Sequence, residues 1–390
     1  MDSKNTTKVA LLGLHLDDNY GDPCIAETVK YIYSKLIPTE TDWLCIDLRK
    51  FCTLDNKHNI SDFHYKIIKK ISNYATRKNR GWLGECVIKY LARIFYRQLD
   101  GVNLGILAGG GTIHYRVHDY WIGISAFIKA CDRRNIPVII NGVGVEDYDE
   151  HNPKCRVFSK YLQWKNVKAA ITRDDLDGLK SYFGQRNIYV TKAIDPVIFG
   201  ADAFNMEPSH NREKFGIGII RTNIFDDYKT SGDIETVVNY ICGLTRELEK
   251  RGYKYDFISN GASCDDSMIP LIEKQLGRTI TVRKPKSSSE LVKMISTYKG
   301  LFTTRMHTGI IAYSLGIPVV GLIWLEKIYY WGQNIKSEKF FMWPKELSPE
   351  KSINLMEEAL EQGYDENLRI KLRSEHLNVV RNALSAAFAK

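Results

Sequence analysis

Short apolar segments alternate with amphipathic ones along this chain, in two series. The first series of strand-like segments comprises Val9–Leu14, Trp43–Leu48, Leu104–Ala108, Pro137–Gly142, Ala169–Thr172 and Ile188–Val190. The second comprises Gly216–Ile220, Tyr255–Ser259, Thr279–Val282, Gly300–Thr303 and Pro318–Ile323. Helical patterns lie between many of them, for example Ile25–Leu36, Trp121–Arg134, Ile234–Arg251 and Glu290–Tyr298. Strands that each lead into a helix predict parallel sheets covered on both faces, so we expect an α/β fold with two Rossmann-like domains.

The boundary between the two series is a polar gap. Ala203–Lys214 contains Pro, Ser, Asn and charged residues without periodicity, and 390 residues suit two domains. We therefore place an N-terminal domain at 1–205 and a C-terminal domain at 206–390. The last helices, from Ser348 to Lys390, either stay with the second domain or cross back to the first. Ligands of open α/β sheets bind beyond the carboxyl ends of the strands, so the expected site is a cleft that both domains face.

Composition excludes several classes of protein. Apolar residues make up 44% of the chain and charged residues 26%, as in ordinary globular proteins. No run of about 18 apolar residues is present to form a membrane-spanning helix, and the polar start, Met1–Val9, does not resemble a secretory signal. The eight cysteines are scattered without a C-x-x-C pair, which argues against a disulfide framework or a zinc site. We expect a cytoplasmic protein without a bound metal or cofactor.

The net charge of +9 favours anionic partners. The excess is concentrated from His64 to Arg97, where nine Lys or Arg residues accompany one acid, Glu85. Two interpretations stay open: a solvated helix face, or a basic amphipathic segment that rests on an anionic membrane. No zinc finger, helix-turn-helix or RNA-binding aromatic signature is present, so we do not expect nucleic acid as the partner.

Polar residues and glycines follow the strands of the first domain. Asn19, Tyr20, Gly21 and Asp22 form a turn before a helix that starts near Pro23. The run Gly109, Gly110 and Gly111 ends the third strand, either as a tight turn or as a loop that lets the backbone approach an anion or a sugar.

Other polar side chains of the first domain have both structural and functional interpretations. His114 and His118 are four residues apart, but no further ligand is evident, so we expect no metal pair there; one of them would line the cleft. Arg173 precedes Asp174 and either lines the cleft or forms a structural ion pair. Asp195 precedes Pro196, and for it we favour a structural hydrogen bond.

The second domain carries the most suggestive chemistry, at Arg305 and His307. A strand leads into Thr304, Arg305 and Met306, and a helical pattern follows from Thr308 to Leu315. A helix N-terminus attracts anions, an arginine adds a forked donor for phosphate or carboxylate, and histidine can transfer a proton near neutral pH. The alternative is a structural role, in which Arg305 and His307 cap the helix and only hold the loop in place.

Taken in order, these motifs resemble those of the polysaccharide pyruvyltransferase family. The matching segments run from about residue 9 to about residue 325 and are N-Y-G-D at 19–22, A-G-G-G at 108–111, R-D at 173–174, D-P at 195–196, and R-M-H at 305–307 followed by a helix and G-I-P. The segment from His64 to Arg97 and the tail beyond Trp331 match no motif of that family.

The resemblance implies a fold, a donor and roles for named residues. The implied fold is the two-domain GT-B-like architecture, and the donor is phosphoenolpyruvate, a co-substrate rather than a cofactor. The implied donor-binding residues are Arg305, His307 and, from its place after the second domain's first strand, Arg221, beside Met306 and Thr308. As catalytic candidates we take His307, Asp22 and His114. Acceptor-side or cleft-lining candidates are Asn19, Gly109, Gly110, Gly111 and Arg173.

The expected reaction moves pyruvate from phosphoenolpyruvate onto two hydroxyls of one sugar, forming a cyclic ketal and releasing phosphate. The acceptor would be a surface polysaccharide, such as an exopolysaccharide or a capsule, or its lipid-linked oligosaccharide precursor. The segment 64–97 would then hold the enzyme at the inner membrane face. The acceptor sugar, the ketal position and the oligomeric state stay open.

Two rival functions remain. A nucleotide-sugar-dependent GT-B glycosyltransferase would also use a glycine loop and a basic second-domain site, although Glu326 is the only evident acid for gripping a ribose. A nucleic-acid-binding or scaffold protein would use the positive charge. The donor that binds separates the first rival from the pyruvyltransferase, and salt-dependent retention on DNA tests the second.

Overall fold

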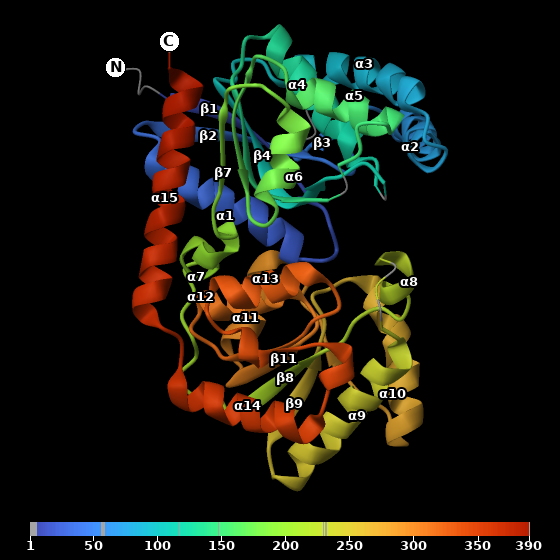
Figure 1. The fold of residues 1–390 in the computed structure, drawn as a ribbon, viewed down its shortest axis with the longest axis vertical. Coiled ribbons are helices and arrows are strands. Elements are labelled where there is room, and N and C mark those ends of the chain that lie inside the picture. The colour runs from blue at the N-terminus through green and yellow to red at the C-terminus, as the bar shows by residue number, and fades with distance from the viewer. Residues whose placement is uncertain are drawn as a thin grey trace. The chain divides into compact units, whose positions relative to one another are not determined.

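The structure, a computed structural model, describes residues 6–55, 59–116, 118–146, 148–228, 230 and 232–389 (Figure 1). The chain divides into two compact units. Unit 1 comprises Met1–Leu16, Ile25–Pro196 and Ser374–Lys390, and unit 2 comprises Asp17–Cys24 and Val197–Arg373. The short segment Asp17–Cys24 thus belongs to unit 2, although the residues on either side of it belong to unit 1.

Unit 1 is built on a seven-stranded sheet in the order β3-β2-β1-β4-β5-β6-β7. The strands are β1 (Thr6–Gly13), β2 (Glu40–Asp47), β3 (Cys52–Thr53), β4 (Leu104–Ile113), β5 (Val138–Val145), β6 (Val167–Thr172) and β7 (Tyr189–Lys192). All neighbours are parallel except β2 and β3. The strand order reverses direction between β1 and β4, as in doubly wound nucleotide-binding folds.

Helices cover the sheet of unit 1. They are α1 (Gly21–Leu36), α2 (Asp62–Arg77), α3 (Gly81–Gln98), α4 (Tyr120–Arg133), α5 (Pro153–Leu162) and α6 (Leu176–Phe183), joined by the last part of α15 (Glu366–Phe388). Figure 1 shows α4, α5 and α6 on one side of the sheet and α15 on the other. Because both faces are covered, the central strand β5 is buried along its whole length rather than at alternate residues.

Unit 2 repeats this plan with a six-stranded sheet in the order β10-β9-β8-β11-β12-β13. Its strands, all parallel, are β8 (Lys214–Gly218), β9 (Lys254–Ile258), β10 (Val282–Arg283), β11 (Gly300–Thr303), β12 (Val319–Leu322) and β13 (Phe341–Met342). Its helices are α7 (Gly200–Ala203), α8 (Ile224–Tyr228), α9 (Ile234–Lys250), α10 (Ile269–Leu276), α11 (Ser288–Ser296), α12 (Met306–Ser314), α13 (Glu326–Asn334) and α14 (Pro349–Gln362), with 3-10 turns at Pro196–Phe199, Ser263–Met268, Glu338–Phe340 and Pro344–Glu346. The strand order reverses between β8 and β11.

The predicted α/β class with two Rossmann-like domains is confirmed. The expectation of a turn or loop at Gly109–Gly111 is wrong, because these residues continue β4 to Ile113. Gly109 serves close packing, because a Cβ there would overlap the carbonyl oxygen of Gly142 on β5. Gly110 has φ +94°, a conformation that glycine adopts without strain, and the register between β4 and β5 shifts beyond Gly111.

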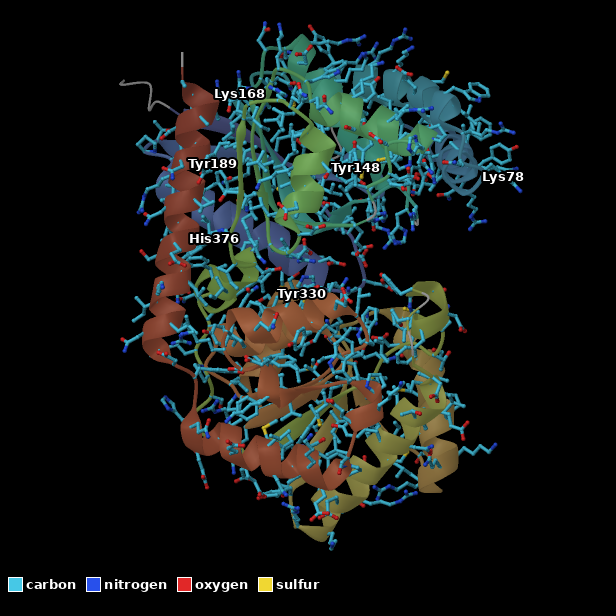
Figure 2. All side chains as sticks on the ribbon, in the orientation of Figure 1. Lys78, Tyr148, Lys168, Tyr189, Tyr330 and His376 are labelled. Atoms are coloured by element: carbon cyan, nitrogen blue, oxygen red, sulfur yellow. The ribbon has the colours of Figure 1, made fainter. Side chains whose placement is uncertain are left out.

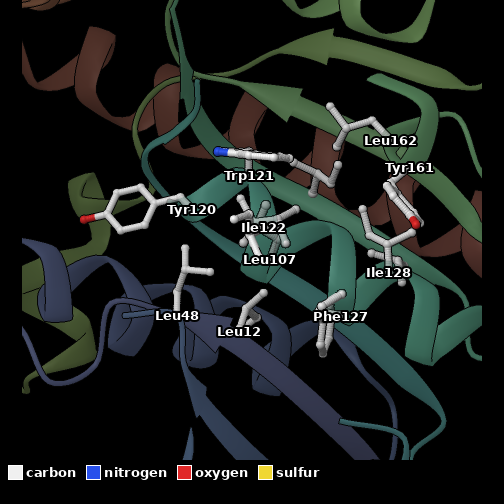
Figure 3. Close-up of a cluster of buried hydrophobic side chains, with 14 of the residues drawn as sticks. Leu12, Leu48, Leu107, Tyr120, Trp121, Ile122, Phe127, Ile128, Tyr161 and Leu162 are labelled. Atoms are coloured by element: carbon white, nitrogen blue, oxygen red, sulfur yellow. The ribbon is translucent and has the colours of Figure 1, made fainter. Parts of the chain in front are cut away.

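The core of unit 1 forms where α3 and α4 pack against the sheet. Figure 3 shows Leu12, Leu107, Trp121 and Phe127 within this cluster, and all four are almost fully buried. The Trp121 Nε1–H donates to Thr76 Oγ1 over 3.1 Å, which ties α4 to the end of α2 and satisfies a buried donor. In the described part of the chain, no helix has both the length and the apolarity needed to cross a bilayer.

The buried residue His376, on the unit 1 part of α15, should make the free energy of unfolding depend on pH under acidic conditions (Figure 2). Its Nδ1 lies 2.8 Å from the Ile194 carbonyl oxygen, and burial lowers its pKa from 6.5 to about 4. Between these values the unfolded chain binds the proton and the folded chain does not, so stability falls as pH decreases through this window. We expect this residue to contribute a loss of about 3 kcal/mol in the free energy of unfolding.

Chemical denaturation at pH 6.5 and at pH 4 measures this loss. His376→Asn keeps an N–H near the Nδ1 position but does not titrate, so the variant should lose less stability than the wild type over the same interval. Equal losses in both proteins would show that His376 plays no part in acid unfolding.

Candidate active site

The corner between β11 and α12 brings the Arg-x-His motif to a helix N-terminus, as predicted. Arg305 is the N-cap residue of α12, with extended backbone, and its N–H donates to Thr303 Oγ1 over 3.0 Å. The Arg305 side chain itself makes no capping hydrogen bond to the first turn of α12. The first N–H groups of a helix have no acceptor within the helix, and they lie at the positive end of its dipole. The corner therefore offers an anion both backbone donors and the Arg305 guanidinium.

Arg305 is held by a buried carboxylate. Its guanidinium bonds Asp265, whose side chain is fully buried, and Ser259 Oγ donates to the same carboxyl over 3.1 Å. Burial raises the pKa of Asp265, and the Arg305 guanidinium opposes that rise. The side chain of Arg305 is 15% exposed. Asp265 thus fixes the guanidinium while leaving part of it accessible to a ligand.

The backbone of Arg221 reaches the same carboxylate. Its N–H donates to Asp265, so the two predicted donor-binding arginines meet at one buried acid. The guanidinium of Arg221 pairs with Asp227 over 2.9 Å, and both side chains are partly exposed. An exposed ion pair contributes little, so an anionic ligand can replace Asp227 at low cost.

His307 lies in the first turn of α12 and faces the carboxylate of Asp22. Its Nδ1 is 3.6 Å from Asp22 Oδ1, and the two side chains are 10% and 19% exposed. A carboxylate at this place orients the imidazole and stabilises a positive charge on it. The two residues were predicted as separate catalytic candidates, and within unit 2 they form one pair.

The segment Asp17–Cys24 is fixed to unit 2 by the loop after β9. Tyr20 N–H donates to the Asn260 carbonyl oxygen over 3.0 Å, and the N–H and Oγ of Ser263 donate to Asp18 over 3.0 and 2.8 Å. Asn260 Nδ2 donates to Asn19 Oδ1 over 3.4 Å, and Asn19 Nδ2 donates to Asp22 over 3.1 Å. These bonds carry the predicted Asn19 and Asp22 to the side of His307.

Thr308 completes this network from α12. Its hydroxyl donates to Asn260 Oδ1, so the amide of Asn260 joins α12 to Asn19. Asn260 is 3% exposed and Asp265 is fully buried, and sequence reasoning named neither. Both follow the correctly predicted strand β9, and their position beyond its carboxyl end is the signal that would have identified them. Met306, the remaining donor-side candidate, is half-buried at the start of α12.

The unit 1 candidates gather beyond β4 and β6. His114 follows β4 directly and is buried, with its ring 5.7 Å from that of His118 and 5.6 Å from that of Tyr120. Gly109, Gly110 and Gly111 lie on β4 itself, with Thr112 and Ile113 between them and His114. Among the described residues, no three His, Cys, Asp or Glu side chains gather as a candidate metal-binding group.

Arg173 follows β6 and forms a buried ion pair. Its Nη1 lies 2.6 Å from Asp195 Oδ2, with the side chains 5% and 3% exposed. The neighbouring Asp174 accepts from the Val145 N–H over 3.0 Å. Arg173 therefore joins the ends of β6 and β7, and Asp195 has the structural hydrogen bond that we favoured.

Gly21 allows the Asp22 segment to approach His307. A Cβ on Gly21 would lie 2.7 Å from His307 Cβ, closer than real Cβ contacts. We expect Gly21→Ala to destabilise the protein by about 1–3 kcal/mol through overpacking and to weaken binding of an anion at the α12 corner. Thermal unfolding and ligand titration measure both effects.

A matched control comes from the same unit. Gly309, on α12, has room for a methyl group, with its nearest neighbour at 3.8 Å. Gly309→Ala should leave stability and binding close to wild type. If Gly21→Ala behaved like Gly309→Ala, the close approach of Gly21 to His307 would be wrong.

Solved structures of two UDP-GlcNAc 2-epimerases and of a trehalose 6-phosphate synthase share this fold. The UDP-GlcNAc 2-epimerase from Methanocaldococcus jannaschii has a TM-score of 0.56 at 12% identity, covering 97% of this chain and 99% of that one. The UDP-N-acetylglucosamine 2-epimerase from Rickettsia bellii gives 0.51 at 12%, with 98% and 97% covered. The α,α-trehalose 6-phosphate synthase from Burkholderia multivorans gives 0.52 at 10%, with 98% and 96% covered. At such identities these similarities show the fold alone, which is the expected GT-B-like class.

The family is shown by the sequence. The family model for polysaccharide pyruvyl transferase matches residues 19–326, most of the chain, and this protein belongs to that family. Among proteins of curated function, none matches the chain. Family membership supports a transferase that acts in polysaccharide biosynthesis, and it confirms the resemblance carried by the N-Y-G-D and R-M-H motifs.

Proposed function

We propose that the protein transfers pyruvate from phosphoenolpyruvate to two hydroxyls of a sugar. The observation that supports this donor most strongly is the α12 corner, where Arg305 and the N-terminus of α12 lie beside Arg221. Phosphoenolpyruvate carries a phosphate and a carboxylate close together. The helix N-terminus with Arg305 suits the phosphate, and Arg221, released from Asp227, suits the carboxylate. Met306 and Thr308 complete this donor side.

The proposed reaction conserves atoms and charge without an oxidant. A proton adds to the methylene carbon of phosphoenolpyruvate, which becomes a methyl group, and the central carbon becomes electrophilic. One sugar hydroxyl bonds to that carbon, and the carbon–oxygen bond to phosphate breaks. A second hydroxyl then closes the ketal. Of the two hydroxyl protons, one replaces the proton taken up by the methyl group and the other leaves with inorganic phosphate.

His307 is the proposed proton carrier. Its imidazole stands at the α12 corner, and Asp22 supports the protonated form. Protonation of the methylene carbon requires such a positioned acid, and the two arginines neutralise the charge that develops on the leaving phosphate. No bound cofactor is required by this scheme.

For the acceptor we propose residues of each unit taken by itself: Asn19 and Asp22 in unit 2, and His114 with the glycine run of β4 in unit 1. His114, His118 and Tyr120 combine aromatic rings in edge-to-face or tilted contact with polar ring nitrogens and a phenol, a combination that suits a sugar. Arg173 acts indirectly, because its guanidinium is bonded to Asp195 and holds the ends of β6 and β7 together. The acceptor proposed is a surface polysaccharide, as in a capsule or exopolysaccharide, or its lipid-linked precursor at the inner membrane face.

Transfer of label tests this proposal. The protein is incubated with phosphoenolpyruvate labelled with ¹³C at the methylene carbon, together with extracted lipid-linked oligosaccharides. The proposal predicts equal release of inorganic phosphate and of a sugar product with a ketal methyl signal. Transfer of a sugar from a nucleotide sugar, without use of phosphoenolpyruvate, would contradict this proposal and identify the protein as a glycosyltransferase.

A further inference from the structure

Exposed apolar side chains are concentrated on two helices of unit 1. Of the fifteen large hydrophobic residues exposed in the described chain, seven lie on α2 and α3, namely Phe63, Ile67, Ile71, Tyr74, Trp82, Tyr90 and Tyr96. Phe63 and Trp82 are the most exposed of all, at 69% and 66%. Single exposed apolar residues are ordinary, but a cluster of this size marks an interaction surface.

On α2, the exposed apolar residues form one stripe. Phe63, Ile67, Ile71 and Tyr74 follow helical spacing, while the opposite face buries Ile68, Ser72, Ala75 and Thr76. The same outer stripe carries the exposed cations Lys66, Lys70, Arg77 and, just past the helix, Lys78. Figure 2 shows Lys78 projecting outward from the end of this helix. The outer side of α2 therefore mixes apolar and basic groups.

Helix α3 repeats the pattern. Its inner face buries Val87, Ile88, Leu91 and Phe95, and its outer face exposes Trp82, Lys89, Tyr90, Arg93, Tyr96 and Arg97. Glu85, the only acid between His64 and Arg97, is bonded to Lys160 on α5. We call these two outer stripes the α2–α3 face.

A pocket of about 330 Å³ opens on the α2–α3 face. Its lining residues are Asn59, Ile60, Tyr90, Arg93, Ile94 and Arg97. Arg93 and Arg97 are one helical turn apart, so both guanidinium groups reach the same space. No carboxylate in the described part of the chain pairs with either. The Asn59 amide is held by Thr53, because its Nδ2 donates to the Thr53 carbonyl oxygen over 3.0 Å. The two arginines and the Tyr90 phenol are the groups of this pocket that suit a phosphate.

We propose that the α2–α3 face docks on a bilayer of anionic phospholipids, with one lipid phosphate held by Arg93, Arg97 and Tyr90. Aromatic rings such as Trp82 settle at the headgroup level of a membrane, and nearby cations bind its anionic lipids. A second copy of this chain is disfavoured as the partner, because its own α2–α3 face carries the same positive charge and would repel the first. Nucleic acid is disfavoured as the partner, because aliphatic residues such as Ile67 and Ile71 can neither donate hydrogen bonds to a phosphate backbone nor neutralise its charge. The inference stands independently of the donor and the reaction.

Flotation with vesicles tests the docking. Wild-type protein is mixed with vesicles of phosphatidylcholine alone or of equal phosphatidylcholine and phosphatidylglycerol. We expect binding only to the second kind, weakening as salt increases. Arg93→Ala with Arg97→Ala should reduce the affinity about 30-fold, since each cation contributes about fivefold near an anionic surface. Phe63→Ser with Trp82→Ser should reduce it at least about 10-fold through lost apolar burial.

A control pair removes the same charge from unit 2. Lys274 and Lys345 are exposed there, and Lys274→Ala with Lys345→Ala should change vesicle binding by no more than about twofold. An equal loss in both charge pairs would mean attraction by net charge alone and would overturn the assigned pocket. Absence of wild-type binding to phosphatidylglycerol vesicles, or stronger retention on double-stranded DNA than on vesicles, would overturn the docking surface.

Tryptophan fluorescence gives a second, local readout. Trp82 should shift its emission to shorter wavelength on phosphatidylglycerol vesicles, and Trp82→Phe should abolish that shift while keeping most of the binding. A shift that survives in Trp82→Phe would contradict insertion of this face. None of these measurements requires phosphoenolpyruvate, so failure of the proposed transfer reaction would leave them unchanged.

Discussion

Arg305→Ala should weaken the binding of phosphoenolpyruvate at least about 100-fold. The variant loses a guanidinium that presents two charge-assisted donors to the ligand phosphate, each worth about 1.5–3 kcal/mol. It also leaves Asp265 buried without its cation, which we expect to lower the free energy of unfolding by about 3–5 kcal/mol. Isothermal titration calorimetry measures the first effect, and chemical denaturation measures the second.

The pH dependence of that second effect has a defined sign. Burial already raises the pKa of Asp265, and removing Arg305 removes an influence that lowers it. The folded variant therefore binds a proton that the unfolded chain does not, so its stability relative to wild type recovers as pH falls. A stability deficit that grew on acidification would contradict this account of Asp265.

Loss of binding must be separated from loss of folding. Arg305→Ala combined with Asp265→Asn removes the buried charge together with its partner, so this double variant should fold but still fail to bind the donor. Asp265→Asn alone keeps the Arg305 guanidinium and should retain affinity within about tenfold. If the double variant bound phosphoenolpyruvate as tightly as wild type, Arg305 would have no role in holding the donor.

His307→Gln should lower kcat by about 100- to 10,000-fold while changing the affinity for phosphoenolpyruvate much less. Glutamine fills a similar volume and can hydrogen-bond, but it cannot carry a proton, and positioned acids contribute rate factors of this size. Steady-state kinetics with labelled donor separates kcat from KM. A loss confined to KM would assign His307 to donor binding rather than to proton transfer.

Asp22 supplies the matched comparison for His307. It lies 3.6 Å from the imidazole and supports its charge, so Asp22→Asn should lower kcat less than His307→Gln does. The combined variant should be no slower than His307→Gln alone, because both changes act on one proton carrier. Losses that multiply would mean that Asp22 contributes to the rate independently of His307.

Periodicity was sufficient to predict the architecture. Strands that are buried on both faces appear as continuous apolar runs, and Gly300–Thr303 occupies the range expected for it. The edge strands β3 and β13 were not predicted, because each has only two residues and no period can be recognised over such a length. The glycine run was misread for a related reason. Glycine ends strands more often than it continues them, and only the carbonyl oxygen of Gly142 on the next strand explains Gly109.

The part of the candidate site that lies within one short segment of the chain could be predicted from the sequence. Arg305 and His307 lie in a strand-to-helix turn, and the sequence pattern predicts both the strand before the turn and the helix after it. Asp265 and Asn260 were not identified, because their partners are far away in the chain: Asn260 meets Asn19 across 241 positions. Polar side chains of loops gain their partners from the docking of segments, which periodicity does not encode.

Calorimetric titration of the wild-type protein with phosphoenolpyruvate, beside UDP-linked sugars, tests the central claim most directly. We expect saturable binding of phosphoenolpyruvate that is lost in the folded Arg305→Ala and Asp265→Asn double variant, with no comparable binding of a nucleotide sugar. Tight binding of a nucleotide sugar in the absence of any heat from phosphoenolpyruvate would contradict it.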